Sequence, residues 1–135
     1  MKIIPVIVLL IITFENEIHS QLFVGLKSSE VIQQLNAERH FHQETNFKND
    51  TYKYLKFYNR SDEETLIVFL TYDDRVRVTR LMSDYSNLDN RTKELNRNYK
   101  KVRQNCWVGT RDGKEYLIEL KKEDWYFTLT TKEKK

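Results

Sequence analysis

The longest apolar run beyond the first twenty residues is LIVFL at positions 66–70. Five successive apolar residues leave no polar face, so we expect a strand that is covered on both sides. Asp73 and Asp74 then predict a turn, although Asp-Asp is a weaker hairpin signal than Asp-Gly. Residues 76–79 follow as a second strand in which valine alternates with polar side chains. This pattern predicts the middle of a sheet and indicates no chemistry.

Two stretches place apolar residues at steps of three and four, which is typical of a helix lying on a core. The first covers residues 28–39, with Val31, Ile32 and Leu35 on one side. The second opens at residues 86–90, and its apolar stripe extends to Val102. Its polar side, with Arg91, Lys93, Glu94 and Arg97, is expected to face outward. Because this side mixes both signs of charge, packing on a sheet is favoured over lying on a membrane surface.

Alternation predicts the remaining strands at residues 52–58, 101–108, 115–120 and 125–130, the last with Trp125, Phe127 and Leu129 on one face. Asp112-Gly113 is the clearest hairpin signal in the chain. The order is therefore helix, three strands, helix, three strands. We predict an α+β fold in which two helix-plus-three-strand units form one antiparallel sheet, with both helices on one face and residues 66–70 in its middle.

The strand at residues 52–58 is rich in aromatic residues. If Leu55 and Phe57 point inward, the tyrosines of the other parity lie on the opposite face, where Phe69 can join them. Clustered exposed aromatic side chains mark binding surfaces, whereas the alternative is that they cover the second face of a small sheet or pack under a loop. The predicted binding residues are Tyr52, Tyr54, Tyr58 and Tyr126.

The first twenty residues have the pattern of a secretory signal peptide. Lys2 precedes an apolar run at residues 3–14, and a polar segment ends at Ser20. Cleavage after Ser20 would leave a single domain, residues 21–135, in a secreted or periplasmic location. A retained anchor is the alternative, but the run is shorter than the ~20 apolar residues that span a bilayer. After cleavage we therefore expect no stable membrane insertion.

Composition narrows the classes of partner. Charged residues make up 32% of the chain and aromatic residues 13%, and this aromatic content argues against disorder. The net charge is +3 with both signs interspersed, so we expect no nucleic-acid partner. The single cysteine, Cys106, excludes an internal disulfide framework. Its neighbour Trp107 favours a buried thiol, and the alternative is an intermolecular disulfide.

No recognised catalytic pattern is present: the chain lacks a glycine-rich phosphate loop, a Gly-x-Ser-x-Gly motif and a zinc-type cysteine pair. We therefore expect neither an enzyme nor a cofactor. His40 and His42 could share a strand face and bind a metal, or serve an enzyme, but no third ligand stands at a recognisable spacing. Surface or half-buried histidines are favoured. Glu63 and Glu64 have the ordinary composition of a turn.

Residues 25–31 (GLKSSEV), with Leu35 four positions later, resemble the opening of the SmpA/OmlA (BamE-like) small envelope proteins. In that family a glycine, a capping hydroxyl, a valine and a leucine begin the first helix. Here Lys27 stands where the hydroxyl usually lies. The resemblance implies a helix-then-meander domain, and the layout also resembles β-lactamase-inhibitor-like small secreted bacterial proteins.

Together these patterns predict a secreted or periplasmic protein-interaction module of an inhibitor-like kind. The alternative is an envelope scaffold, or a small-ligand-binding protein with a pocket between the sheet and the helices.

Overall fold

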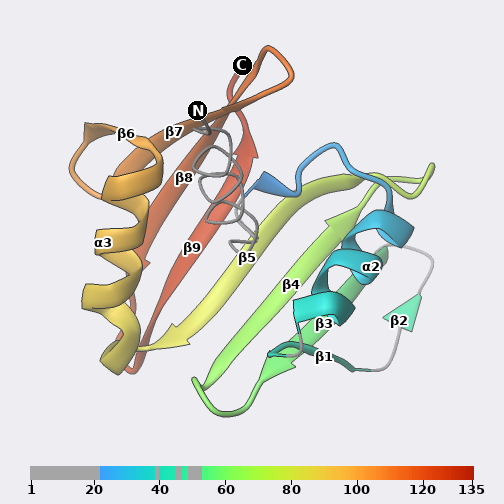
Figure 1. The fold of residues 1–135 in the computed structure, drawn as a ribbon, viewed down its shortest axis with the longest axis horizontal. Coiled ribbons are helices and arrows are strands. Elements are labelled where there is room, and N and C mark those ends of the chain that lie inside the picture. The colour runs from blue at the N-terminus through green and yellow to red at the C-terminus, as the bar shows by residue number, and fades with distance from the viewer. Residues whose placement is uncertain (1–21, 39, 45–46, 49–52) are drawn as a thin grey trace, which may run out of the picture.

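The computed structural model describes residues 22–38, 40–44, 47–48 and 53–135. Figure 1 shows one sheet with the helices α2 (Ser28–Glu38) and α3 (Leu88–Asn98) on the same face. A 3-10 helix, η2 (Tyr85–Asn87), leads into α3. The strands are β1 (His42–Gln43), β2 (Phe47–Lys48), β3 (Lys53–Asn59), β4 (Glu64–Leu70), β5 (Val76–Asp84), β6 (Lys100–Arg103), β7 (Cys106–Arg111), β8 (Lys114–Lys122) and β9 (Tyr126–Glu133).

The strands lie in the order β1-β3-β4-β5-β9-β8-β7-β6, and β2 also pairs with β3. Every pairing is antiparallel. Two meanders therefore meet where the last strand of each, β5 and β9, pair over seven residues from Val78↔Lys132 to Asp84↔Tyr126. The α+β antiparallel architecture is confirmed, but the two helix-plus-three-strand units are wrong, because α2 precedes five strands and α3 precedes four.

The extra strand of the second half comes from a turn that the sequence hides. Residues 101–108 were expected to form one strand, yet they are divided between β6 and β7. Asn105 lies at the turn with φ of 61°, a left-handed conformation that asparagine adopts more readily than most residues. At Asp112 and Gly113, both with positive φ, the expected hairpin turn is confirmed.

The expectation that residues 66–70 are covered on both sides is wrong. Within β4, Leu66, Val68 and Leu70 are buried, whereas Ile67 and Phe69 are half-buried. The helices cover only one face, so the strand obeys the two-residue alternation of side chains despite its apolar sequence. Nor is β4 the middle of the sheet, which lies at the pairing of β5 with β9.

The core lies between the helices and the covered face of the sheet. Val31 and Leu35 of α2 and Leu95 of α3 are fully buried in one cluster with the inward side chains of the strands. Each such side chain contributes about 1.5–3 kcal/mol on burial. Trp107 Nε1 also donates a hydrogen bond of 2.8 Å to Asn96 Oδ1, which ties α3 to β7. The inward orientation of Leu55 and Phe57 is confirmed.

Two expected core residues lie outside this cluster. Trp125 is 86% exposed because β9 begins one residue later than expected, at Tyr126. Phe127 and Leu129 point inward as expected, but Trp125 lies before the strand and does not share their face. Val102 is exposed on the edge strand β6, since α3 ends at Asn98 and does not carry its apolar stripe that far. In the described part of the chain, no helix has both the length and the apolar content needed to cross a bilayer.

Leu66→Ala and Ile67→Ala test the assignment of faces at adjacent positions. We expect Leu66→Ala to lower the free energy of unfolding by about 2–5 kcal/mol, because it leaves a cavity in the core. Ile67→Ala should cost less than half as much, since its side chain is already in partial contact with water. Urea unfolding measures both. Equal losses would contradict a sheet covered on one face.

Candidate functional site

The first candidate surface is the sheet face turned away from the helices. Register partners on neighbouring strands point to the same side, so three rows of side chains cross β3, β4, β5, β9 and β8. We call these three rows the open face. They are Tyr54, Phe69, Val78, Lys132 and Leu117; then Lys56, Ile67, Arg80, Thr130 and Glu119; then Tyr58, Thr65, Met82, Thr128 and Lys121.

The structure brings together only some of the predicted tyrosines. Tyr54 and Tyr58 lie on β3, both half-buried, and the Tyr54 ring centroid is 6.3 Å from that of Phe69. Tyr126 belongs to the same side but lies opposite Asp84, one row beyond the open face and three strands from Tyr58. Tyr52 lies outside the described residues. The aromatic side chains thus gather at the β3–β4 end, and Tyr126 flanks the other half.

Cations outnumber carboxylates on the open face. Lys56, Lys121 and Lys132 lie 3.4–3.5 Å from the carboxylates of Glu44, Glu123 and Glu119. A hydrogen bond with Tyr58, and after it the pairing with Glu44, outweighs burial and raises the pKa of Lys56.

Arg80 differs from these lysines. Its side chain is exposed, and Nε donates a long hydrogen bond of 3.4 Å to Thr130 Oγ1. Within the described residues Arg80 forms no ion pair. The arginine at the centre of the open face therefore has no carboxylate partner among the residues that the structure describes.

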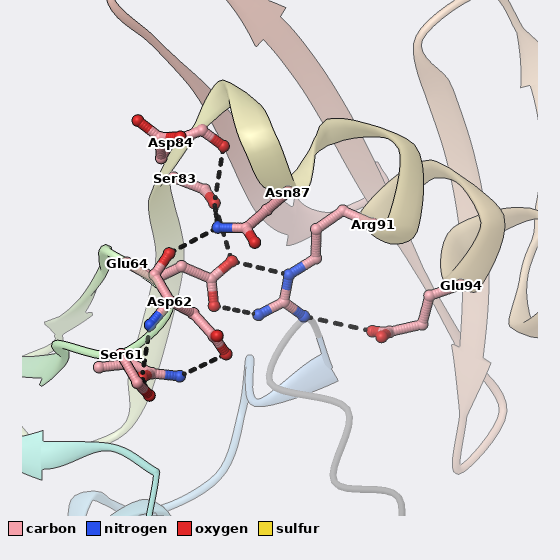
Figure 2. Close-up of polar contacts among 9 residues, drawn as sticks. Ser61, Asp62, Glu64, Ser83, Asp84, Asn87, Arg91 and Glu94 are labelled. Carbon is pink, nitrogen blue, oxygen red and sulfur yellow. Dashed lines mark hydrogen bonds and ion pairs between the residues drawn. The ribbon is translucent and has the colours of Figure 1, made fainter.

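A second cluster of polar side chains lies on the helix side, between α3 and the start of β4 (Figure 2). The Glu64 side chain is only 1% exposed. Arg91 of α3 donates to both of its oxygens, from Nε at 2.9 Å and from Nη2, and Ser83 Oγ donates to Oε2 at 2.8 Å. Arg91 Nη1 also lies 3.3 Å from Glu94 Oε1. We call these residues the Glu64–Arg91 network.

The charges of this network satisfy one another. Burial lowers the pKa of the Arg91 guanidinium, but hydrogen bonds and attraction from Glu64, with further attraction from Glu94 and Asp62, outweigh it and leave the pKa above its ordinary value. A pocket of about 280 Å³ adjoins the network, bordered by His40 and Asn90 among others. Because Glu64 and Arg91 bind each other in a two-pronged pair, we interpret the network as the tie that holds α3 on the sheet.

Sequence reasoning missed this network. It placed Glu64 in a turn and Arg91 on the exposed side of its helix, yet the pair is largely buried. One local signal was available: Glu64 has the same parity as Leu66 and Val68, which predicts an inward side chain. The partner could not be found in this way, since Arg91 is 27 residues away.

The histidines and the cysteine were the other sequence candidates. His40 lies in a bend and His42 begins β1, both exposed. No three or more acidic, histidine or cysteine side chains converge as a metal site in the described part of the chain. Cys106 is buried with a free thiol, as expected. Its register neighbours Arg103 and Glu119 form an ion pair of 3.6 Å across it.

No family model, no curated protein and no solved structure matches this chain. The resemblance of residues 25–35 to the SmpA/OmlA opening, and that of the layout to β-lactamase-inhibitor-like proteins, stay predictions.

A double-mutant cycle tests whether the Glu64–Arg91 network acts as a tie. Arg91→Met leaves a buried carboxylate without its cation, and we expect a loss of about 3 kcal/mol in the free energy of unfolding. Glu64→Leu/Arg91→Met should recover at least half of that loss, because it removes both charges. Lys93→Met, at an exposed position of α3, is the control and should change stability by less than about 0.5 kcal/mol. If the losses of Glu64→Leu and Arg91→Met measured separately add up to the loss of the double variant, the two side chains are not coupled and the network does not act as a tie.

Proposed function

We propose that this protein is a secreted or periplasmic interaction module that binds a protein partner through the open face. The observation that carries the proposal is a broad sheet face with no helix over it in the described part of the chain, on which half-buried aromatic and apolar side chains surround the exposed Arg80. Tyrosine, phenylalanine, methionine and arginine are the residue types enriched at the centres of protein interfaces.

The dimensions of the open face support a protein partner. Five strands spaced ~4.8 Å apart, over the five residues of each strand that the three rows span at ~3.3 Å each, give a platform roughly 24 Å by 17 Å. Its area is about half of the ~800 Å² that each partner buries in a standard protein interface, and so of the same order. A small molecule would cover only a fraction of it.

The secreted location rests on the pattern of residues 1–20, which lie outside the described residues. Cleavage after Ser20 would leave Gln21 at the new N-terminus, immediately before Leu22, the first residue that the structure describes. Phe23 and Val24 are buried in the core. Arg111 donates hydrogen bonds to the carbonyl oxygens of Leu22 and Val24, so the new N-terminus would be held in place.

Photo-crosslinking from the open face tests the function. We expect the full chain with p-benzoylphenylalanine at Thr128 to capture one protein from the extracellular or periplasmic fraction. Tyr54→Ala on the open face, or Tyr126→Ala in the row that adjoins it on the same side of the sheet, should weaken capture at least about tenfold. Interface aromatic residues often contribute more than 1.4 kcal/mol each.

Tyr72→Ala is the matched control for this experiment. Tyr72 is 99% exposed, but it lies at the β4–β5 turn and outside the open face. Capture that is equally sensitive to all three substitutions, or to none, would contradict the proposal. A small polar compound that raises the melting temperature, and loses this effect in Asn90→Ala at the pocket of the Glu64–Arg91 network, would favour the small-ligand alternative.

N-terminal sequencing of the protein from its native source tests the location. Cleavage of the leader predicts a mature chain that begins at Gln21 in the extracellular or periplasmic fraction. A protein found in the cytosol with residues 1–20 intact would contradict the secreted location, while leaving the open face as a binding surface to be tested by crosslinking.

A further inference from the structure

A hollow of about 630 Å³ lies at the end of the sheet where β5, β9 and β8 run side by side, and it borders both the open face and Val24, Gly25 and Val76, which lie outside that face. Val78 and Leu117, both half-buried, form part of its lining, and Lys132 lies between them in the first row of the open face. The exposed surface of the lining is mainly apolar, although four of its ten residues carry a charge. Such a concave apolar surface with few polar groups is the usual form of a site that receives an anchoring side chain.

The charged residues that line this hollow are mainly basic. Arg77, Lys132 and Lys135 contribute three positive side chains, against one carboxylate from Glu133. Lys132 already has Glu119 at 3.5 Å. Arg77 is exposed and forms no ion pair with any residue that the structure describes. The same holds for Arg80, in the second row of the open face.

These two arginines restrict what can cover the face. Covering a guanidinium removes its water, and that cost is best recovered when a carboxylate or a similar anion is placed opposite. A planar guanidinium matches a carboxylate with two parallel hydrogen bonds. The partner that best matches Arg77 and Arg80 therefore brings acidic groups, together with an apolar side chain for the hollow.

We infer that the partner presents an acidic protein segment whose carboxylates pair with Arg77 and Arg80 while an apolar side chain enters the hollow. This inference rests on the proposed function and adds the chemistry of the partner. A protein is favoured over a nucleic acid because the net charge is only +3 and three lysines of the open face are already paired with carboxylates.

Charge reversal in the photo-crosslinking experiment tests the inference. With the crosslinker at Thr128, we expect Arg77→Glu/Arg80→Glu to lower capture of the partner at least tenfold, and Arg77→Gln/Arg80→Gln to lower it by a smaller factor. Capture by the parent chain should fall as NaCl is raised from 50 to 500 mM. Mass spectrometry should map the crosslink to a segment rich in aspartate and glutamate. Leu117→Asn, which makes the hollow more polar, should also reduce capture several-fold.

Lys114→Glu is the matched control, because Lys114 is exposed at the β7–β8 turn with the parity of the covered face, and it should change capture less than twofold. Melting temperatures verify that each variant is folded. Capture that depends on Tyr54 but is unchanged by the arginine reversals overturns the inference and leaves the proposed function intact. Capture that ignores Tyr54 and Tyr126 overturns the function itself. Displacement of the partner by a 20-residue oligothymidylate would identify a nucleic-acid site and overturn the inference.

Discussion

The pairing of β5 with β9 is the interaction on which the rest of the structure depends. It joins two meanders that are far apart in the chain, Arg80 and Thr130 being 50 residues from each other. Without this pairing, α2 and α3 would lie on separate small sheets, and each half would be small enough to be only marginally stable. With it, both helices share one core and the opposite face becomes continuous across the junction.

The open face and the core are two consequences of the same alternation. Leu66 points into the core and Ile67 away from it, so each strand serves stability on one side and can serve recognition on the other. The Glu64–Arg91 network adds a polar tie on the covered side. Its charges are already matched, whereas Arg80 on the open side is not. Because of this contrast, we assign a stabilising role to the Glu64–Arg91 network and a binding role to the open face.

Local sequence patterns predicted the features that depend on neighbouring residues, namely the helices, one hairpin turn and the inward face of a strand. The apolar stripes identified both helices, Asp112 and Gly113 identified a hairpin, and the parity of Phe57 identified the covered face. Long-range features were not predictable, because nothing near Val78 specifies β9 as its neighbour. The turn at Asn105 lacked a glycine signal, and the burial of Glu64 needs a cation 27 residues away.

A cross-strand disulfide tests the junction most directly. In a Cys106→Ser background, Arg80→Cys/Thr130→Cys places two thiols at directly paired positions, within the Cα separation of about 4.4–6.8 Å that a disulfide spans. A single continuous sheet predicts that this pair forms an intramolecular disulfide under mild oxidation. The circular dichroism spectrum of the folded protein should stay unchanged. Arg80→Cys/Glu119→Cys, on the same face but two strands apart, should form none. Failure of the first pair to close, or equal closure of both pairs, would contradict the single continuous sheet.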